Sequence, residues 1–208
     1  MSQSAFSDWP IISVQKRGVK LVKLNKIYTR TGDDGSTGLA DGSRIGKECF
    51  RVRAYGEVDE ANSALGIARL YVDNIELDRM LERIQNDLFD LGADLSTPTL
   101  DDDSKALRVV QSQIDRLESE LDHLNKDIAP LKTFVLPGGS KPAAYLHLAR
   151  AITRRAEREI VHMSRTEQLN PLALKYTNRL SDFLFVAARW CNAQGETDVK
   201  WIPGKNRI

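Results

Sequence analysis

The chain has 208 residues and a balanced charge, with 30 Lys and Arg against 29 Asp and Glu and a formal net charge of +1. This length predicts one domain, or one domain with an appendage, because a chain of this size easily sustains a compact core. A nearly neutral chain lacks the broad positive field of a general nucleic-acid binder, so any anion site has to be built locally.

Targeting and redox signals are few. The N-terminus lacks the apolar core of a signal peptide, and no apolar run approaches the roughly 20 residues of a membrane span. The two cysteines, Cys49 and Cys191, make neither a disulfide framework nor a metal-binding pattern. We therefore expect a cytoplasmic protein in a reducing compartment, with neither nucleic acid nor membrane as a partner.

The first recognisable element is rich in glycine. Residues 1–25 show no clean periodicity and are expected to form a flexible or accessory extension, and residues 29–42 then read TRTGDDGSTGLADG. Backbone N–H groups in such a loop are able to surround an anion. The stretch is neither a P-loop nor a dinucleotide fingerprint, because Gly46-Lys47 is followed by glutamate and no GxGxxG occurs. Phosphate binding stands beside a plainer alternative, a mobile connector or a hairpin.

Helical patterning follows almost to the end of the chain. The predicted helices span 57–72, 76–95, 104–126, 141–165 and 171–194. Long helices with short connections predict an all-α, up-and-down five-helix bundle of the ferritin-like or four-helix-bundle type, preceded by a glycine-rich nucleotide-binding segment. In domain terms, 1–25 is an extension, 26–194 is the bundle and 195–208 is a C-terminal tail.

The second and third predicted helices carry the clearest apolar stripes. The stripe of the second consists of Leu81, Ile84, Leu88, Leu91 and Leu95. The stripe of the third consists of Leu107, Val110, Ile114, Leu117, Leu121 and Leu124. Before the fourth helix, FVLPGGSKP breaks the chain, with Ser140 placed to cap the helix and Pro142 in its first turn.

The fourth predicted helix gathers arginines on one face. These are Arg150, Arg154, Arg158 and Arg165, with Arg155 at the margin and Glu157 beside them. Like charges at i, i+4 repel, so a single-sign face predicts an anion opposite it. The alternative is that the arginines pair with acids on neighbouring helices or with water.

Other polar residues support weaker predictions. On the fifth helix, Asn178 and Asp182 are spaced to converge on one ligand, whereas Arg189 is interpreted as a solvent-exposed member of a surface pair. The three histidines, His123, His147 and His162, show no metal-ligand spacing and are predicted to lie on helix surfaces. The acids of YGEVDEAN, Glu57, Asp59 and Glu60, are placed at the start of a helix, where negative charge is favourable.

Four segments taken in order resemble the PduO-type ATP:corrinoid adenosyltransferases. They are KIYTRTGDDGSTGL, RVRAYGEVDEANSALG, KTFVLPGGS with ARAITRRAERE, and YTNRLSDFLFVAAR, and the likeness runs from about Lys26 to Trp190. The resemblance implies a homotrimer of five-helix bundles with its active sites between subunits. It also implies transfer of the 5′-deoxyadenosyl group of ATP to the cobalt of a reduced corrinoid, cob(I)alamin, with release of triphosphate.

The same resemblance implies roles for individual residues. Nucleotide contacts are expected from Thr29, Arg30, Thr31, Gly32, Asp33, Thr37, Gly38, Lys47, Arg154, Arg155, Glu157, Arg158 and Asn178, with Mg²⁺ on the phosphates. Asp59 and Arg150 match an acid and an arginine that pair across the subunit boundary. Phe134 matches an aromatic residue beneath the corrin ring; without the family match, we would interpret it as core packing. We expect Arg154, Asp182 and Phe134 to act directly in catalysis, and we expect no metal bound by protein side chains alone.

The chemistry agrees with these roles. Co(I) is itself the nucleophile, so no serine, cysteine or base is needed for the attack. A corrinoid reductase and an adenosylcobalamin-dependent acceptor enzyme are conceivable partners. The alternative class is a non-catalytic helical module that binds a nucleotide or polyanion as a sensor or scaffold; a pure interaction bundle would bind no nucleotide.

Overall fold

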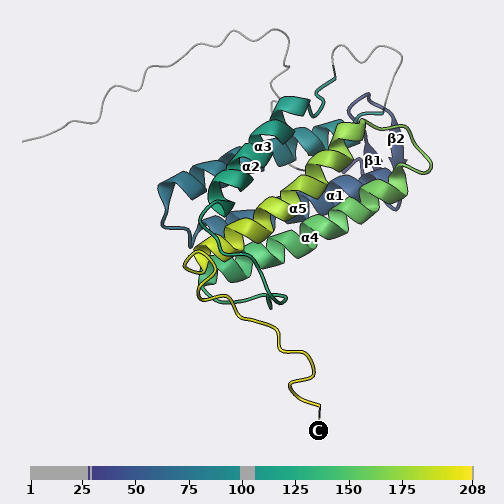
Figure 1. The fold of residues 1–208 in the computed structure, drawn as a ribbon. Coiled ribbons are helices and arrows are strands. Elements are labelled where there is room, and N and C mark those ends of the chain that lie inside the picture. Colours follow the sequence, from purple (N-terminus) through teal and green to yellow (C-terminus); the bar gives the residue numbers. More distant parts are fainter. Residues whose placement is uncertain (1–27, 29, 99–105, 208) are drawn as a thin grey trace, which may run out of the picture.

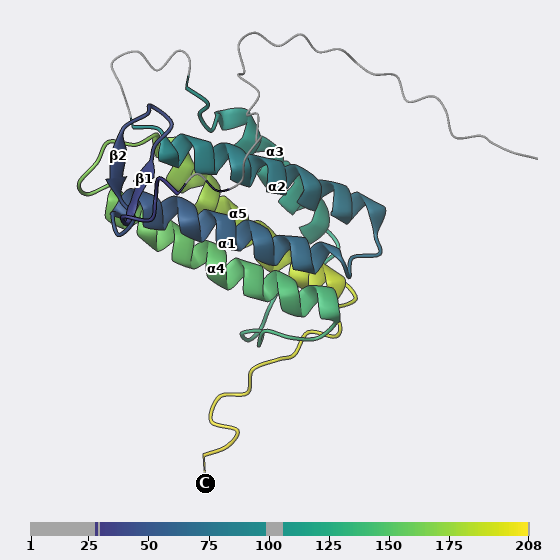
Figure 2. The same ribbon diagram turned by 180° about the vertical axis from the view of Figure 1, so that it is seen from behind.

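The computed structural model describes residues 28, 30–98 and 106–207, and the predicted N-terminal extension lies outside them. Five helices dominate: α1 (Phe50–Arg69), α2 (Ile75–Ser96), α3 (Gln111–Asn125), α4 (Lys141–Met163) and α5 (Pro171–Cys191). They lie side by side in one bundle, in which α4 packs against both α1 and α5 (Figures 1 and 2). The predicted all-α bundle is confirmed. Among the described residues, no helix is long and apolar enough to cross a membrane.

The glycine-rich stretch forms a small hairpin, which was the plainer of its two interpretations. Strands β1 (Ser36–Gly38) and β2 (Arg44–Gly46) pair antiparallel. Two Asp-Gly-Ser turns build it: Asp34 and Asp41 each accept hydrogen bonds from the N–H and the hydroxyl of the serine two residues on. These bonds lower the pKa of both carboxyls. The intervening glycines have φ of 84° and 87°, which favours glycine over any other residue.

Helix α1 begins at Phe50, before the predicted start at 57. Cys49 has the extended backbone of an N-cap residue, and Ala54 continues the buried face that Val58 and Ala61 prolong. The acids Glu57, Asp59 and Glu60 therefore lie within the helix, so their placement at a helix start is wrong. The predicted start at 57 follows Gly56, because glycine is unfavourable inside helices. In the structure Gly56 nevertheless occupies an exposed position within α1.

Helix α3 begins at Gln111, so the predicted start at 104 is wrong, and residues 104 and 105 lie outside the described part. Leu107 and Val110 precede the helix and are exposed rather than members of its apolar stripe. The segment is held extended by the carboxylate of Asp94, which accepts from Arg108 and from the N–H of Val109. The other three helices match their predicted ranges within a few residues, and Ser140 caps α4 as predicted.

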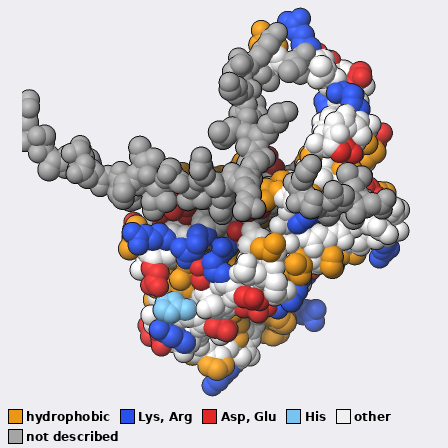
Figure 3. Space-filling model, turned by 90° about the horizontal axis from the view of Figure 1, so that it is seen from above, with side chains coloured by type: hydrophobic (Ala, Val, Ile, Leu, Met, Phe, Trp, Pro, Cys, Tyr) orange, Lys and Arg blue, Asp and Glu red, His pale blue; other side chains and the backbone are white. Residues whose placement is uncertain are grey.

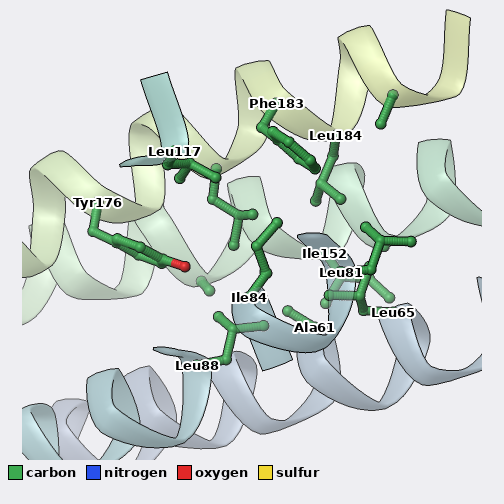
Figure 4. Packing of buried hydrophobic residues seen from close by; sticks show 14 of the residues in the cluster. Ala61, Leu65, Leu81, Ile84, Leu88, Leu117, Ile152, Tyr176, Phe183 and Leu184 are labelled. Atoms are coloured by element: carbon green, nitrogen blue, oxygen red, sulfur yellow. The ribbon is translucent and has the colours of Figure 1, made fainter. Parts of the chain in front are cut away.

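The core lies between the apolar faces of the helices (Figure 4). The predicted stripe of α2 is buried throughout, and its Leu81, Ile84 and Leu88 lie among residues of α1, α4 and α5. A polar group enters this core at Tyr176, whose hydroxyl donates to Asp87 at 2.9 Å. Burial raises the pKa of Tyr176 well above its ordinary value, so the phenol stays a donor.

A buried carboxylate, which we call the polar joint, connects several segments by hydrogen bonds at one end of the bundle. Asp94 is buried near the end of α2 and accepts from Arg108, Val109 and Asn170, the N-cap residue of α5. One carboxylate therefore connects α2, the segment before α3 and the start of α5. Removing one partner of a buried ion pair leaves an uncompensated charge, which is strongly destabilising.

We expect Asp94→Ala to lower the free energy of unfolding by about 3–5 kcal/mol, because Arg108, the N–H of Val109 and the amide of Asn170 would lose this buried carboxylate as an acceptor. Urea unfolding followed by circular dichroism measures this value. The control is Asp122→Ala on exposed α3 surface, expected within about 0.5 kcal/mol of the wild type. Equal losses in the two variants would show that the joint adds nothing.

Candidate functional site

Three residues that the sequence singled out separately meet on the surface between α4 and α5. Glu157 lies 3.6 Å from Arg154 and accepts from the Asn178 side chain at 2.8 Å. Arg158 donates to the carbonyl of Arg154 one turn back. A cavity of about 440 Å³, which we call the arginine cavity, is lined by three arginines and two glutamates together with Val161 and His162; the charged residues are Arg154, Glu157, Arg158, Glu159 and Arg165. A cationic concavity of this kind is suited to phosphate, because guanidinium groups donate paired hydrogen bonds to phosphate oxygens.

Arg155 points in another direction, toward α1. Its guanidinium donates to both Glu57 and Glu60, and these two carboxylates raise its pKa. Arg155 therefore illustrates the alternative interpretation, in which an arginine pairs with acids on a neighbouring helix. Successive residues on a helix lie about 100° apart, so Arg154 and Arg155 face different surroundings. A nucleotide contact from Arg155 stays a prediction.

A second cavity lies further along α4, toward its N-terminus. It measures about 320 Å³ and is lined by Leu131, Phe134, Val135, Pro137, His147, Arg150, Asp182 and Phe185; we call it the Phe134 cavity. Arg150 lies over the ring of Phe185, 5.4 Å from its centroid, and burial lowers its pKa. Phe134 is 76% exposed, which excludes the alternative of core packing and leaves the predicted place beneath a corrin ring open. Asp182, which also lines this cavity, accepts a hydrogen bond from Arg179 at 2.7 Å.

His147 is buried, which contradicts its predicted place on a helix surface. Only 3% of it is exposed, and its ring lies 6.1 Å from that of Phe185. Burial, and then the charge of Arg150, lower its pKa, although Asp198 opposes them. Its Nε2 atom has no hydrogen-bond partner among the described residues. No pattern in the sequence indicates this burial, because Phe185 of α5, whose ring lies beside His147, is far away along the chain. His123 and His162 are exposed as predicted.

Arg189 is also buried, so its interpretation as a surface residue is wrong. It donates to Asp198 at 2.8 Å and to the carbonyl of Ala129 at 2.9 Å. Its partner lies in the segment predicted as a tail, beyond the reach of helix-wheel reasoning.

The glycine-rich hairpin lies at the end of the bundle where α4 ends (Figures 1 and 2). Phe50, which follows it, stacks on His162 of α4 with ring centroids 4.0 Å apart. Lys47 donates to the carbonyl of Gly32 at 2.7 Å. The described loop residues of the prediction, Arg30, Thr31, Gly32, Asp33, Thr37, Gly38 and Lys47, all lie in or beside the hairpin, and Thr29 lies outside the described part.

Arg44 was missed at the sequence level. It donates to the carbonyl of Thr31 and to the hydroxyl of Ser36, and so connects β2 to the loop that precedes β1. An arginine inside a short polar strand carries no pattern that would distinguish it from a solvent-exposed residue. Its contacts show that it shapes the loop from which phosphate contacts are expected.

One face of the molecule carries side chains of both signs (Figure 3). On the face shown in Figure 3, positive and negative side chains are interspersed, with apolar side chains between them. The balanced composition gives the chain no broad positive field, so the cationic character of the arginine cavity is local.

A helical bundle that carries a local cationic cavity beside a glycine-rich hairpin belongs to the class of proteins suited to bind an anionic ligand. Residues 27–191 match the family model of the cobalamin adenosyltransferases. The chain therefore belongs to this family, and the resemblance to its PduO-type members is confirmed.

Comparison with individual relatives supports the same family assignment. The corrinoid adenosyltransferase of Mycobacterium tuberculosis is 50% identical over 190 residues, 89% of this chain and 97% of the relative. That of Bacillus subtilis is 42% identical over 181 residues, 85% of this chain and 92% of the relative. A variant PduO-type ATP:corrinoid adenosyltransferase from Lactobacillus reuteri, complexed with cobalamin and ATP, shares 42% identity with a TM-score of 0.79, covering 85% of this chain and 99% of that one.

The buried imidazole makes stability depend on pH. A histidine with a folded-state pKa below its ordinary value of 6.5 takes up a proton more readily when unfolded, so the fold loses stability as the pH falls below about 6.5. We expect the Tm to fall less steeply in His147→Gln than in the wild type between about pH 7 and about pH 5. His162→Gln, at an exposed histidine, is the control and should follow the wild type. Parallel curves for wild type and His147→Gln would contradict the effect of burial.

Proposed function

We propose that this chain transfers the 5′-deoxyadenosyl group of ATP to the cobalt of a reduced corrinoid and releases triphosphate. The observation that carries the proposal is the order of features along α4. The Phe134 cavity lies toward its N-terminus, Arg150 and Arg154 follow, and the arginine cavity ends at Arg165 near the hairpin. Arg150 and Arg158, which both lie on α4, are about 12 Å apart along the helix axis at about 1.5 Å per residue. This arrangement would allow the Phe134 cavity to accept the apolar ring of a corrinoid and the arginine cavity to accept the polyphosphate of ATP. The names and bound ligands of the relatives point the same way.

The proposed reaction is a displacement at C5′. Co(I) supplies the electron pair of the new Co–C bond, the C5′–O bond breaks with its electrons on oxygen, and triphosphate leaves. Negative charge grows on the leaving group, so preorganised arginines beside it lower the barrier. Arg154 and Arg158, with Asn178 and the hairpin residues, are the proposed nucleotide contacts, and Asp182 lines the Phe134 cavity.

Mg²⁺ fits this site as a partner of the nucleotide. Among the described residues, no group of three or more His, Cys, Asp or Glu side chains is arranged to hold a metal. Mg²⁺ usually keeps several waters and binds one or two carboxylates plus substrate phosphates. Glu157 is the carboxylate beside Arg154, so it would hold the ion against the phosphates and neutralise their charge.

We further propose a homotrimer with active sites between subunits. Asp59 is exposed on α1, and within the described chain neither it nor Arg150 has an ion-pair partner. Two groups left unpaired in one copy are available to pair between copies, as the family resemblance implies. Asp59 also lines a groove of about 860 Å³ with the apolar side chains of Leu39, Tyr55 and Phe89, which a second copy would cover.

The direct test combines purified protein, ATP, Mg²⁺ and chemically reduced cob(I)alamin. Absorbance follows formation of the adenosylated corrinoid, and a separate assay measures triphosphate. Product with equimolar triphosphate supports the proposal. ATP binding without corrinoid-dependent triphosphate release would favour the alternative of a nucleotide-binding sensor or scaffold.

In that assay we expect Arg154→Ala to lower turnover by about a hundredfold to a thousandfold, because a donor to the developing negative charge is lost. Its sedimentation behaviour should match that of the wild type. Arg79→Ala, at an exposed arginine on α2, is the matched control and should keep full activity. Near-normal turnover in Arg154→Ala would remove this residue from the mechanism.

Phe134 is proposed to keep the lower face of the corrin dry. An axial ligand donates electrons to Co(II) and makes its reduction harder, so an apolar ring that excludes the ligand favours Co(I). We expect Phe134→Ala to slow adenosylation that starts from Co(II) and a chemical reductant by about tenfold or more, a barrier increase of about 1.4 kcal/mol. Adenosylation from pre-reduced Co(I) should change much less. Equal slowing in both assays would argue against control of the axial ligand.

A further inference from the structure

We infer that the segment after α5, residues 195–202, is a positioning element for Phe134 and thereby controls how readily the protein uses a Co(II) corrinoid. The inference rests on the proposed function. This segment belongs to the part of the chain, 195–208, that was predicted to be a C-terminal tail outside the bundle.

The core does little to fix the side chain of Phe134. With 76% of the residue exposed, few neighbouring atoms restrict its rotation or displacement. Its position therefore depends on the backbone that carries it, between the end of α3 and the start of α4. This backbone belongs to no named helix or strand and contains two glycines, Gly138 and Gly139, which leave it conformationally free unless something binds it.

Residues 199–201 bind that backbone directly. Val135 and Lys200 form an antiparallel bridge, in which the N–H of Leu136 donates to Val199 at 2.7 Å and the N–H of Trp201 donates to the carbonyl of Phe134 at 2.9 Å. The ring of Trp201 lies 5.9 Å from the ring of Phe134 at 57°. Both the main chain of Phe134 and its side chain therefore contact this segment.

The other side of the same backbone is held by Asn192, at the end of α5. Its side chain is fully buried, accepts from the N–H of Ser140 at 2.9 Å and donates to the carbonyl of Gly138 at 3.1 Å. A Cβ at Gly139 would come within 2.2 Å of its Oδ1, so only glycine fits there. The amide group thus fixes the distance between the end of α5 and the start of α4.

A buried ion pair anchors the whole arrangement. Asp198 accepts from Arg189 at 2.8 Å and from Asn192 at 3.2 Å, and its side chain has no solvent exposure. A buried pair resists displacement, because separating its members leaves an uncompensated charge. The anchor therefore fixes residues 198–201 to α5, and these residues in turn fix Phe134 at the mouth of the cavity.

The consequence concerns one step of the proposed reaction. Reduction of bound Co(II) takes one electron from an external reductant, such as a reduced flavin in the assay, and gives Co(I). That step depends on whether the lower face is free of ligand. The later attack of Co(I) on C5′ takes place at the other face of the ring. Displacement of Phe134 should therefore slow the first step far more than the second.

Trp201→Pro tests this inference. Proline removes the N–H that Phe134 accepts, and with it the indole ring, but leaves the Arg189–Asp198 pair intact. Ile202→Pro is the matched control, since the N–H of Ile202 donates no hydrogen bond within the described residues. The readouts are adenosylation from Co(II) with reduced flavin, adenosylation from pre-reduced Co(I), and the absorption spectrum of bound Co(II) with ATP, which reports the axial ligand.

We expect Trp201→Pro to slow the Co(II) assay by about tenfold to a hundredfold, the cost of a small misplacement of a reacting partner. The Co(I) assay should stay near the wild-type rate, and the spectrum should shift toward ligand-bound Co(II). The double variant Phe134→Ala/Trp201→Pro should be no slower than Phe134→Ala, because the two residues act through one contact. If Trp201→Pro lowers the Tm, Trp201→Ala replaces it in the Co(II) and Co(I) assays. Trp201→Ala removes the indole ring but keeps the backbone hydrogen bond to Phe134.

Three results would overturn the inference. They are equal slowing from Co(I) and Co(II), multiplicative losses in the double variant, and an equal effect of Ile202→Pro. A wild type that forms no adenosylcorrinoid even from Co(I) would instead refute the proposed function, so the two failures are distinguishable.

Discussion

The position of α4 between α1 and α5 is the constraint on which the rest of the structure depends. Its apolar face has to fill the core, and its two flanks have to satisfy different neighbours. Arg155 on one flank is neutralised by acids of α1, whereas Arg154 on the other has Glu157, at 3.6 Å, as its one ion-pair partner among the described residues. One helix therefore provides both an internal ion pair that fixes its orientation and a cationic surface that is still available to a ligand.

Buried polar groups fix the two ends of the bundle that α4 spans. At one end Asp94 joins α2 to the start of α5, and at the other Asn192 and Asp198 join the end of α5 to the start of α4. Apolar packing alone tolerates small shifts of one helix along another, whereas a hydrogen bond to a buried carboxylate does not. The arginine cavity and the Phe134 cavity each lie close to one of these ends. The buried polar groups would therefore keep the distance between the two cavities constant.

The sequence was sufficient for the helices whose apolar stripes are long, because the 3.6-residue period is a property of the local chain. It was insufficient where a distant residue decides the local structure. Asp94 holds residues 108 and 109 extended, and Asp198 draws Arg189 into the interior. His147 is likewise buried because α5, which is distant along the chain, places Phe185 beside it. The arginine face was predictable as a pattern, but only packing against α1 separates Arg155 from Arg154.

The exposure of the arginine cavity bears on the proposed assembly. The side chain of Arg154 is 49% exposed in a single chain. A charge so open to water interacts with phosphate only weakly, since the dielectric constant of water screens it. Catalysis by preorganised charge needs water to be excluded around the leaving group. The described residues of a single copy leave this cavity open and also leave an apolar groove beside Asp59 uncovered. A neighbouring copy that covers both would turn a weak surface site into a strong one, which is the physical argument for active sites between subunits.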